Sequence, residues 1–231
     1  MTPPWDPHNN NKYHLFRSVM GDPMGASVLD WGGNSGNLLR YSEGAIAEHN
    51  YTCVDVDQQA VQAGAEYHPH SRFVHWNKWS SSYNPTGHHN ILWPEIPAHD
   101  LVYSFSIFTH TSYEEFVQTV EWLQQHTLHR QAHSLLDIRQ RDRVKWFYDK
   151  RVTQFGSCVD FVKYTHDENV HILEVYDNDT VLTNNTQSKR RNSEAYVVFY
   201  DMEWLLQNLQ SRGWNVEISC PLPERQPFVI L

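Results

Sequence analysis

The sequence predicts an α/β fold with a mostly parallel sheet and helices on both of its faces. Short apolar runs alternate with segments of helical periodicity between residues 27 and 138. A turn of small residues follows the first apolar run directly, in the stretch SVLDWGGNSGNLL. Strands and helices that alternate in this way form βαβ units, whose strands are parallel. At 231 residues, the chain is expected to fold as one domain, 1–231.

The expected elements follow one another along the first part of the chain. Strands are predicted at 27–31, 51–57, 71–76, 100–106 and 133–138, and helices at 11–20, 36–49, 58–67 and 112–128. The last of these helices is indicated by the spacing of Phe116, Val120 and Leu123. Residues 80–97 are rich in Ser, Pro, Asn and Gly, which is typical of a loop.

The second part of the chain has a different pattern. A helix is predicted over 141–155, followed by a hairpin in VHILEVYDNDTVLTN with its turn at 177–179. The stretch AYVVFYDMEWLLQNLQSRGW predicts a strand that leads into a helix ending near Gly213. Two strands, in WNVEISC and PFVIL, are expected after it.

Composition and charge exclude several classes of function. The net charge of −9 argues against nucleic acid or an anionic membrane surface as the partner. No apolar run reaches the ~18 residues of a membrane span, and the start of the sequence shows no apolar leader. We therefore expect a cytoplasmic protein. Three widely spaced cysteines and histidines without acids at ligand spacing predict neither disulfides nor a metal site.

The glycine-rich turn after the first strand predicts a ligand site. In open α/β sheets, ligands bind at the carboxyl ends of the strands, where helix N–H groups are unsatisfied. Asp55 ends the second apolar run about 20 residues past Gly36, the distance at which dinucleotide folds place an acid on ribose hydroxyls. Asp30, just before Gly32, would repel a pyrophosphate but suit a cationic ligand.

At this point the sequence resembles the class I S-adenosylmethionine-dependent methyltransferases of the small-molecule type. VLDWGGNSG is similar to their glycine motif, with Asn34 in place of the middle glycine. CVDVD resembles their second motif, in which the acid, here Asp55, binds both ribose hydroxyls. The resemblance implies a Rossmann-like, seven-stranded, mostly parallel sheet with its last strand antiparallel. It also implies S-adenosylmethionine as the cofactor.

Further stretches extend the resemblance along the chain. FVHWNKW is similar to the third motif, with Asn77 in place of the commoner Asp, and HDLVYSFSIFTHTSYEEF is similar to the fourth. The resemblance implies a set of cofactor-binding residues at the ends of the first four strands. These residues are Asp30, Gly32, Gly36, Asp55, Val56, Asn77, Lys78 and Ser104.

The catalytic candidates are aromatic and imidazole side chains. His110 is a candidate general base, because an unperturbed imidazole titrates near neutrality. The region 141–195 matches the family poorly and is rich in aromatic residues. We expect it to form a hairpin-containing lid that closes over the sulfonium, with Tyr148 and Tyr176 in contact with the pocket.

Three functions are compatible with these residues. The first is methylation of a small molecule by in-line displacement at the sulfonium methyl, for which the protein positions and desolvates the reactants. The second is cyclisation of S-adenosylmethionine itself, in which its α-amine attacks its γ-carbon to give azetidine-2-carboxylate and methylthioadenosine. The third is a non-catalytic S-adenosylmethionine-binding module. The acceptor and the oligomeric state stay open.

Overall fold

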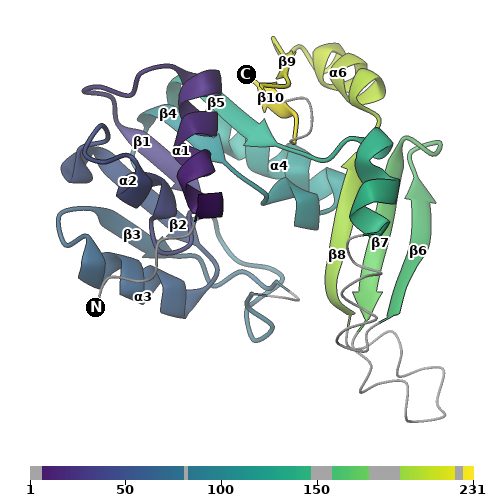
Figure 1. Cartoon of the computed structure of the whole chain (residues 1–231), viewed down its shortest axis with the longest axis horizontal. Coiled ribbons are helices and arrows are strands. Elements are labelled where there is room, and N and C mark those ends of the chain that lie inside the picture. Colours follow the sequence, from purple (N-terminus) through teal and green to yellow (C-terminus); the bar gives the residue numbers. More distant parts are fainter. Residues whose placement is uncertain (1–6, 81–82, 147–157, 177–192, 222–225) are drawn as a thin grey trace.

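The computed structural model describes residues 7–80, 83–146, 158–176, 193–221 and 226–231. Within these ranges, no helix combines the length and the apolar character needed to cross a bilayer. The described elements form one large sheet with helices around it and a smaller sheet to one side (Figure 1).

The large sheet has seven strands in the order β3-β2-β1-β4-β5-β10-β9. Its strands are β1 Val28–Trp31, β2 Tyr51–Asp55, β3 Arg72–His75, β4 His99–Ser104, β5 Thr127–Ser134, β9 Glu217–Ser219 and β10 Phe228–Ile230. The first five strands pair in parallel, whereas β10 is antiparallel to both β5 and β9. The predicted Rossmann-like sheet with an antiparallel last strand is therefore confirmed.

Helices cover both faces of this sheet (Figure 1). They are α1 Pro7–Met20, α2 Asn37–Tyr41, α3 Gln58–Tyr67, α4 Tyr113–Gln124 and α6 Met202–Ser211, with short 3-10 turns at η1 Glu48–Asn50, η2 Phe108–His110 and η3 Ile138–Gln140. Successive side chains of a strand point to opposite faces. Val28 accordingly packs with α1 and α2, and Leu29 packs with α4 and α6.

Polar caps fix where three helices begin. Asp57 accepts hydrogen bonds from two backbone amides at the start of α3, and Asp201 does the same for α6. The hydroxyl of Ser112 accepts from the Glu115 amide at the start of α4. Such caps satisfy N–H groups that have no partner within the helix.

Several predicted boundaries are wrong, among them the end of the helix predicted over 112–128, which stops at Gln124. The helix expected over 36–49 ends at Tyr41, because Glu43 and Gly44 adopt left-handed backbone conformations that a right-handed helix excludes. The fifth strand begins at Thr127 rather than at 133. It carries polar residues that are nevertheless buried, such as Gln131, so apolar periodicity did not reveal it.

The smaller sheet has three antiparallel strands in the order β6-β7-β8. They are β6 Cys158–Thr165, β7 Val170–Tyr176 and β8 Ser193–Tyr200. The predicted hairpin within 170–184 is thus corrected: β7 pairs with β6 and β8, because the apolar pattern of a strand does not specify its neighbour. The predicted turn at 177–179 lies outside the described residues. Of the helix predicted over 141–155, residues 141–146 are described and helical.

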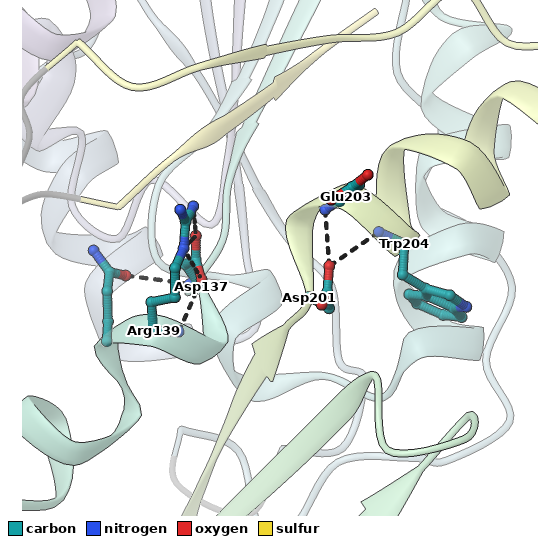
Figure 2. A network of polar contacts seen from close by, with 6 residues as sticks. Asp137, Arg139, Asp201, Glu203 and Trp204 are labelled. Carbon is teal, nitrogen blue, oxygen red and sulfur yellow. Dashed lines mark hydrogen bonds and ion pairs between the residues drawn. The ribbon is translucent and has the colours of Figure 1, made fainter.

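The two sheets are joined where β5 and β8 end. The backbone amide of Tyr200 donates to the carbonyl of Leu136 at 2.8 Å. Figure 2 shows the carboxylates that follow each strand: Asp137 accepts hydrogen bonds from Arg139, and Asp201 caps α6. The ring of Tyr200 packs near that of Phe116. The small sheet is therefore anchored to the large one through the backbone and through shared core.

The turn between β6 and β7 has an unusual backbone. His166, Asp167 and Glu168 have φ values of +54°, +54° and +67°. Glu168→Gly should raise the free energy of unfolding by about 1 kcal/mol, because glycine adopts a left-handed conformation without strain. Chemical denaturation measures this change. Glu66→Gly, within α3, is the matched control and should lower stability by about 1 kcal/mol. A loss of stability in Glu168→Gly would contradict the prediction.

Candidate functional site

A cavity of about 530 Å³ lies at the carboxyl ends of β1, β2 and β4. Its wall is formed by the turn after β1, the end of β2, the segment after β3, the loop after β4 with the start of α4, and Lys12 of α1. This is the edge of an open parallel sheet at which ligands bind, and the volume is that of a small-molecule site.

The turn after β1 is held close to its neighbours. Gly32 has a φ of +75°, and a Cβ atom there would lie 2.0 Å from the Cδ1 atom of Ile107. Gly36 has a φ of +80°, and its Cβ would lie 2.9 Å from the ring of Phe73. Gly32 lines the cavity, whereas Gly36 serves the packing of α2 against β3 and lies outside the cavity wall. The contact of Gly36 with a cofactor stays a prediction.

Asp55 presents its carboxylate to the cavity in a fixed orientation. Its Oδ2 atom accepts from the Asn34 amide at 2.7 Å, and Oδ1 accepts from the Asp57 amide at 2.9 Å. Burial raises the pKa of this carboxyl, against the opposing effect of the two amides. Each carboxylate oxygen accepts more than one hydrogen bond, so the pinned group keeps capacity for a pair of hydroxyls. Val56, the next residue, also lines the cavity.

Asp30, whose contact with a cofactor stays a prediction, is buried at the end of β1. It is only 4% exposed and lies outside the cavity wall. Its Oδ2 atom accepts a hydrogen bond of 2.6 Å from the Tyr51 hydroxyl, beneath the glycine turn. Burial raises the pKa of Asp30 to about 6, while the Tyr51 hydrogen bond and the charge of Lys12 oppose this rise. Asp30 is therefore a buried support of the turn.

Asn77 and Ser104 are also engaged within the protein and lie outside the cavity wall. The Oδ1 atom of Asn77 accepts from Asn84 Nδ2 at 3.0 Å. The hydroxyl of Ser104 is fully buried and lies 2.9 Å from His133 Nδ1. Burial lowers the pKa of His133 to about 3, so this ring is neutral. The sequence placed both polar residues at strand ends. It could not show that their polar atoms already form hydrogen bonds with other side chains of the protein.

The segment after β3, predicted to be a loop, forms one wall of the cavity. Lys78 pairs with Glu115 of α4 at 2.9 Å, and both side chains line the cavity while being only 22% and 29% exposed. Trp79 and His89 stack with ring centroids 4.4 Å apart and line the cavity as well. The aromatic residues of this segment were the signal in the sequence that could have revealed its role.

His110, the predicted base, lines the cavity from the end of η2. The ring of Tyr83 meets it edge-on at 6.3 Å. Thr111, the next residue, also lines the cavity, and its hydroxyl has no hydrogen-bond partner among the described residues. The structure thus places two polar side chains from the segment before α4 at the cavity. The role of His110 as a base stays a prediction.

Lys12 is a cavity residue that the sequence did not reveal. It comes from α1, and its Nζ atom lies 5.7 Å from the centre of the Phe105 ring, which also lines the cavity. Within the described ranges, Lys12 forms no ion pair. A cation at this position offers a binding group for an anion.

The lid predicted for 141–195 stays a prediction. None of the described residues in this range lines the cavity. Tyr148 lies outside the described residues, and Tyr176 ends β7 with a side chain outside the described part. Across the ranges that the structure covers, no three His, Cys, Asp or Glu side chains gather as metal ligands do.

Solved structures share this architecture, methyltransferases among them. The DhpI-SAM-HEP complex has a TM-score of 0.56 at 14% identity, with 97% of this chain and 86% of that chain covered. The glycopeptide N-methyltransferase MtfA complexed with sinefungin has a TM-score of 0.55 at 10% identity, with 99% and 97% covered. SAM-bound CalS10, an amino pentose methyltransferase from Micromonospora echinaspora, has a TM-score of 0.52 at 12% identity, with 99% and 92% covered.

No family model and no curated protein sequence matches the chain. At identities of 10–14%, the likeness to solved structures establishes the fold. The chain therefore has the Rossmann-like fold of the class I methyltransferases.

The buried Asp30 should make stability depend on pH. A carboxyl whose pKa rises on folding stabilises the folded state at low pH, and this contribution is lost as pH rises from about 4 to about 6. Over that range, wild type should lose about 3 kcal/mol relative to Asp30→Asn. Denaturation of both proteins at several pH values measures the difference. Asp22→Asn, a change at an exposed residue, is the control. A difference in stability between wild type and Asp30→Asn that does not depend on pH would disprove the raised pKa of Asp30.

Proposed function

We propose that this protein is an S-adenosylmethionine-dependent methyltransferase that acts on a small molecule. The observation that carries the proposal is the carboxylate of Asp55, pinned by two backbone amides at the edge of the cavity. It stands beside a glycine turn at the end of a parallel strand, where it suits a ribose diol. The fold shared with methyltransferase structures supports the same conclusion.

The charges in the cavity favour one orientation of the cofactor. Trp76, the Lys78–Glu115 pair, Gly32 and Lys12 all line the cavity. With the ribose at Asp55, we assign the adenine to the side of Trp76 and the amino-acid end to the side of Gly32 and Lys12. The tryptophan offers an aromatic surface to the adenine. The Lys12 cation suits the carboxylate of the amino-acid end. The sulfonium then lies between Asp55 and Lys12.

S-adenosylmethionine would supply an electrophilic methyl group, and the protein would supply position and a dry environment. Phe105 and Ile107 give the cavity an apolar wall near Gly32, which would favour a dry environment once the donor is bound. The pinned Asp55 would hold the ribose and the Lys12 ammonium the carboxylate, on either side of the sulfonium, which would fix the direction of approach for an in-line attack. His110 is the candidate to remove a proton where the acceptor arrives protonated.

Asp55→Ala should weaken the binding of S-adenosylhomocysteine by about tenfold or more, because hydrogen bonds to a charged group are lost. Isothermal titration calorimetry measures the affinity. Asp57→Asn is the matched control: it removes a nearby charge, keeps a cap for α3 and leaves the cavity wall unchanged. Unchanged affinity in a folded Asp55→Ala variant would rule out the ribose assignment.

Lys12→Met should weaken the binding of S-adenosylhomocysteine by about tenfold but leave the binding of methylthioadenosine unchanged, since only S-adenosylhomocysteine has a carboxylate. Competition of the two compounds, followed by calorimetry, measures this contrast. Arg17→Met, an exposed change on the same helix, should affect neither compound. Equal losses for both compounds would show that Lys12 acts on the fold rather than on the carboxylate.

Incubation with S-adenosylmethionine alone, followed by mass spectrometry, separates the alternatives. The proposal expects no turnover until an acceptor is added. Methylthioadenosine formed without an acceptor would identify a cyclase. Binding of the donor without turnover, even with a broad set of acceptors, would favour a non-catalytic module.

A further inference from the structure

Ser106, in the loop after β4, has a backbone conformation that few residues with a side chain adopt. Its φ is +60°, in the left-handed region that glycine favours. Its amide donates to the Ser134 hydroxyl at 2.7 Å, and its carbonyl accepts from the Thr109 hydroxyl at 3.0 Å. Strained residues gather at functional sites. Here hydrogen bonds from two neighbouring elements maintain the strained residue in the cavity wall.

The hydroxyl of Ser106 is bound by one side-chain amide. Gln226, which precedes β10, has its Nε2 atom 2.8 Å from Ser106 Oγ, to which it donates. Ser106 Oγ donates in turn to Gln226 Oε1, 3.1 Å away. A hydroxyl has one hydrogen and two lone pairs. Gln226 uses the hydrogen and one lone pair of the hydroxyl. Ser106 can therefore accept one further hydrogen bond through its second lone pair.

Ser106 lies near the proposed position of the sulfonium, the reacting group of the cofactor. In the proposed orientation, the sulfonium lies between Asp55 and Lys12, over the turn at Gly32. Ile107, the residue after Ser106, packs directly on Gly32. Phe105, the residue before it, lies under the Lys12 ammonium. Ser106 is therefore flanked in the sequence by two residues that border the proposed position of the sulfonium. This placement of Ser106 beside the sulfonium rests on the proposed function.

We propose that Ser106 binds the methyl acceptor and that it selects acceptors whose reacting atom carries a hydrogen. The lone pair of the reacting atom must point at the methyl carbon for an in-line attack. Because Ser106 donates its own hydrogen to Gln226, it can bind the reacting atom only by accepting a hydrogen from it. Gln226 is the positioning residue: it accepts the hydrogen of the Ser106 hydroxyl and so keeps that hydrogen turned away from the acceptor. The substrate class is thus an amine or a hydroxyl compound, and thiolates and carboxylates are disfavoured.

The reaction balances without a further reagent except water. The bond between the acceptor nitrogen or oxygen and the methyl carbon forms as the bond between sulfur and carbon breaks. The electron pair of the broken bond stays on sulfur, which becomes a neutral thioether. The hydrogen held by Ser106 leaves the acceptor as a proton, which His110 can accept and then release to water.

Sinefungin tests this inference without knowledge of the acceptor. In sinefungin, a carbon that bears a primary amine replaces the sulfur and its methyl group, so its N–H groups stand where the transferred group and the acceptor meet. S-adenosylhomocysteine lacks the amine and serves as the reference. Wild type should bind sinefungin more tightly than S-adenosylhomocysteine, and calorimetry measures the ratio of the two dissociation constants.

Ser106→Gly should lower this preference by about tenfold, with little change in the affinity for S-adenosylhomocysteine. Glycine suits the φ of +60°, so this variant keeps the loop, and Ser106→Ala checks the result with a side chain present. Gln226→Met should lower the preference in the same direction by a smaller factor. Ser80→Ala removes another hydroxyl of the cavity wall and should leave the ratio unchanged.

The outcomes separate this inference from the proposed function. An unchanged ratio in Ser106→Gly, with S-adenosylhomocysteine still bound, would overturn the role of Ser106 alone. A wild-type protein that shows no preference for sinefungin would overturn it equally. Failure of wild type to bind either compound would instead overturn the proposed function on which the inference rests.

Discussion

The turn after β1 is held against its neighbours on both sides, and the walls of the cavity are arranged around it. The amide of Gly32 donates to the carbonyl of Val54 at 2.7 Å, and the amide of Asn34 donates to Asp55. On the other side, Ile107 fills the space that a side chain at Gly32 would need. Backbone at this turn is therefore close to β2 and to the loop after β4, which brings Asp55 and Ser106 to one cavity.

Two buried polar side chains at the ends of β1 and β4 are satisfied by other polar groups of the interior. Asp30 is bound to Tyr51, and Ser104 is bound to the neutral ring of His133. Because unpaired polar groups are costly to bury, these pairs restrict the directions that the side chains can take. The consequence for the site is that residues at strand ends divide into two sets. Some, such as Asp55, face the cavity, and others support the turn from below.

The sequence predicted the parallel sheet and part of the cavity from local features. Gly32 and Asp55 were found because a left-handed turn and a strand-end acid leave a pattern of a few residues. Lys12 was missed because nothing in its neighbourhood along the chain marks it, and α1 brings it to the cavity from outside the strand and helix units. Gln226 was missed for the same reason, since it contacts Ser106 from 120 positions away.

By itself, the sequence determined most strands of the large sheet, where the glycine turn lies and that β2 ends in an acid, because backbone conformation and side-chain alternation depend on neighbouring residues. It did not reveal β6. Tertiary structure alone decided that β7 pairs with β6 and β8, that the segment after β3 closes one wall, and that Asp30 is buried. These features depend on which distant segments meet. Apolar periodicity shows that a face is buried but not which partner covers it.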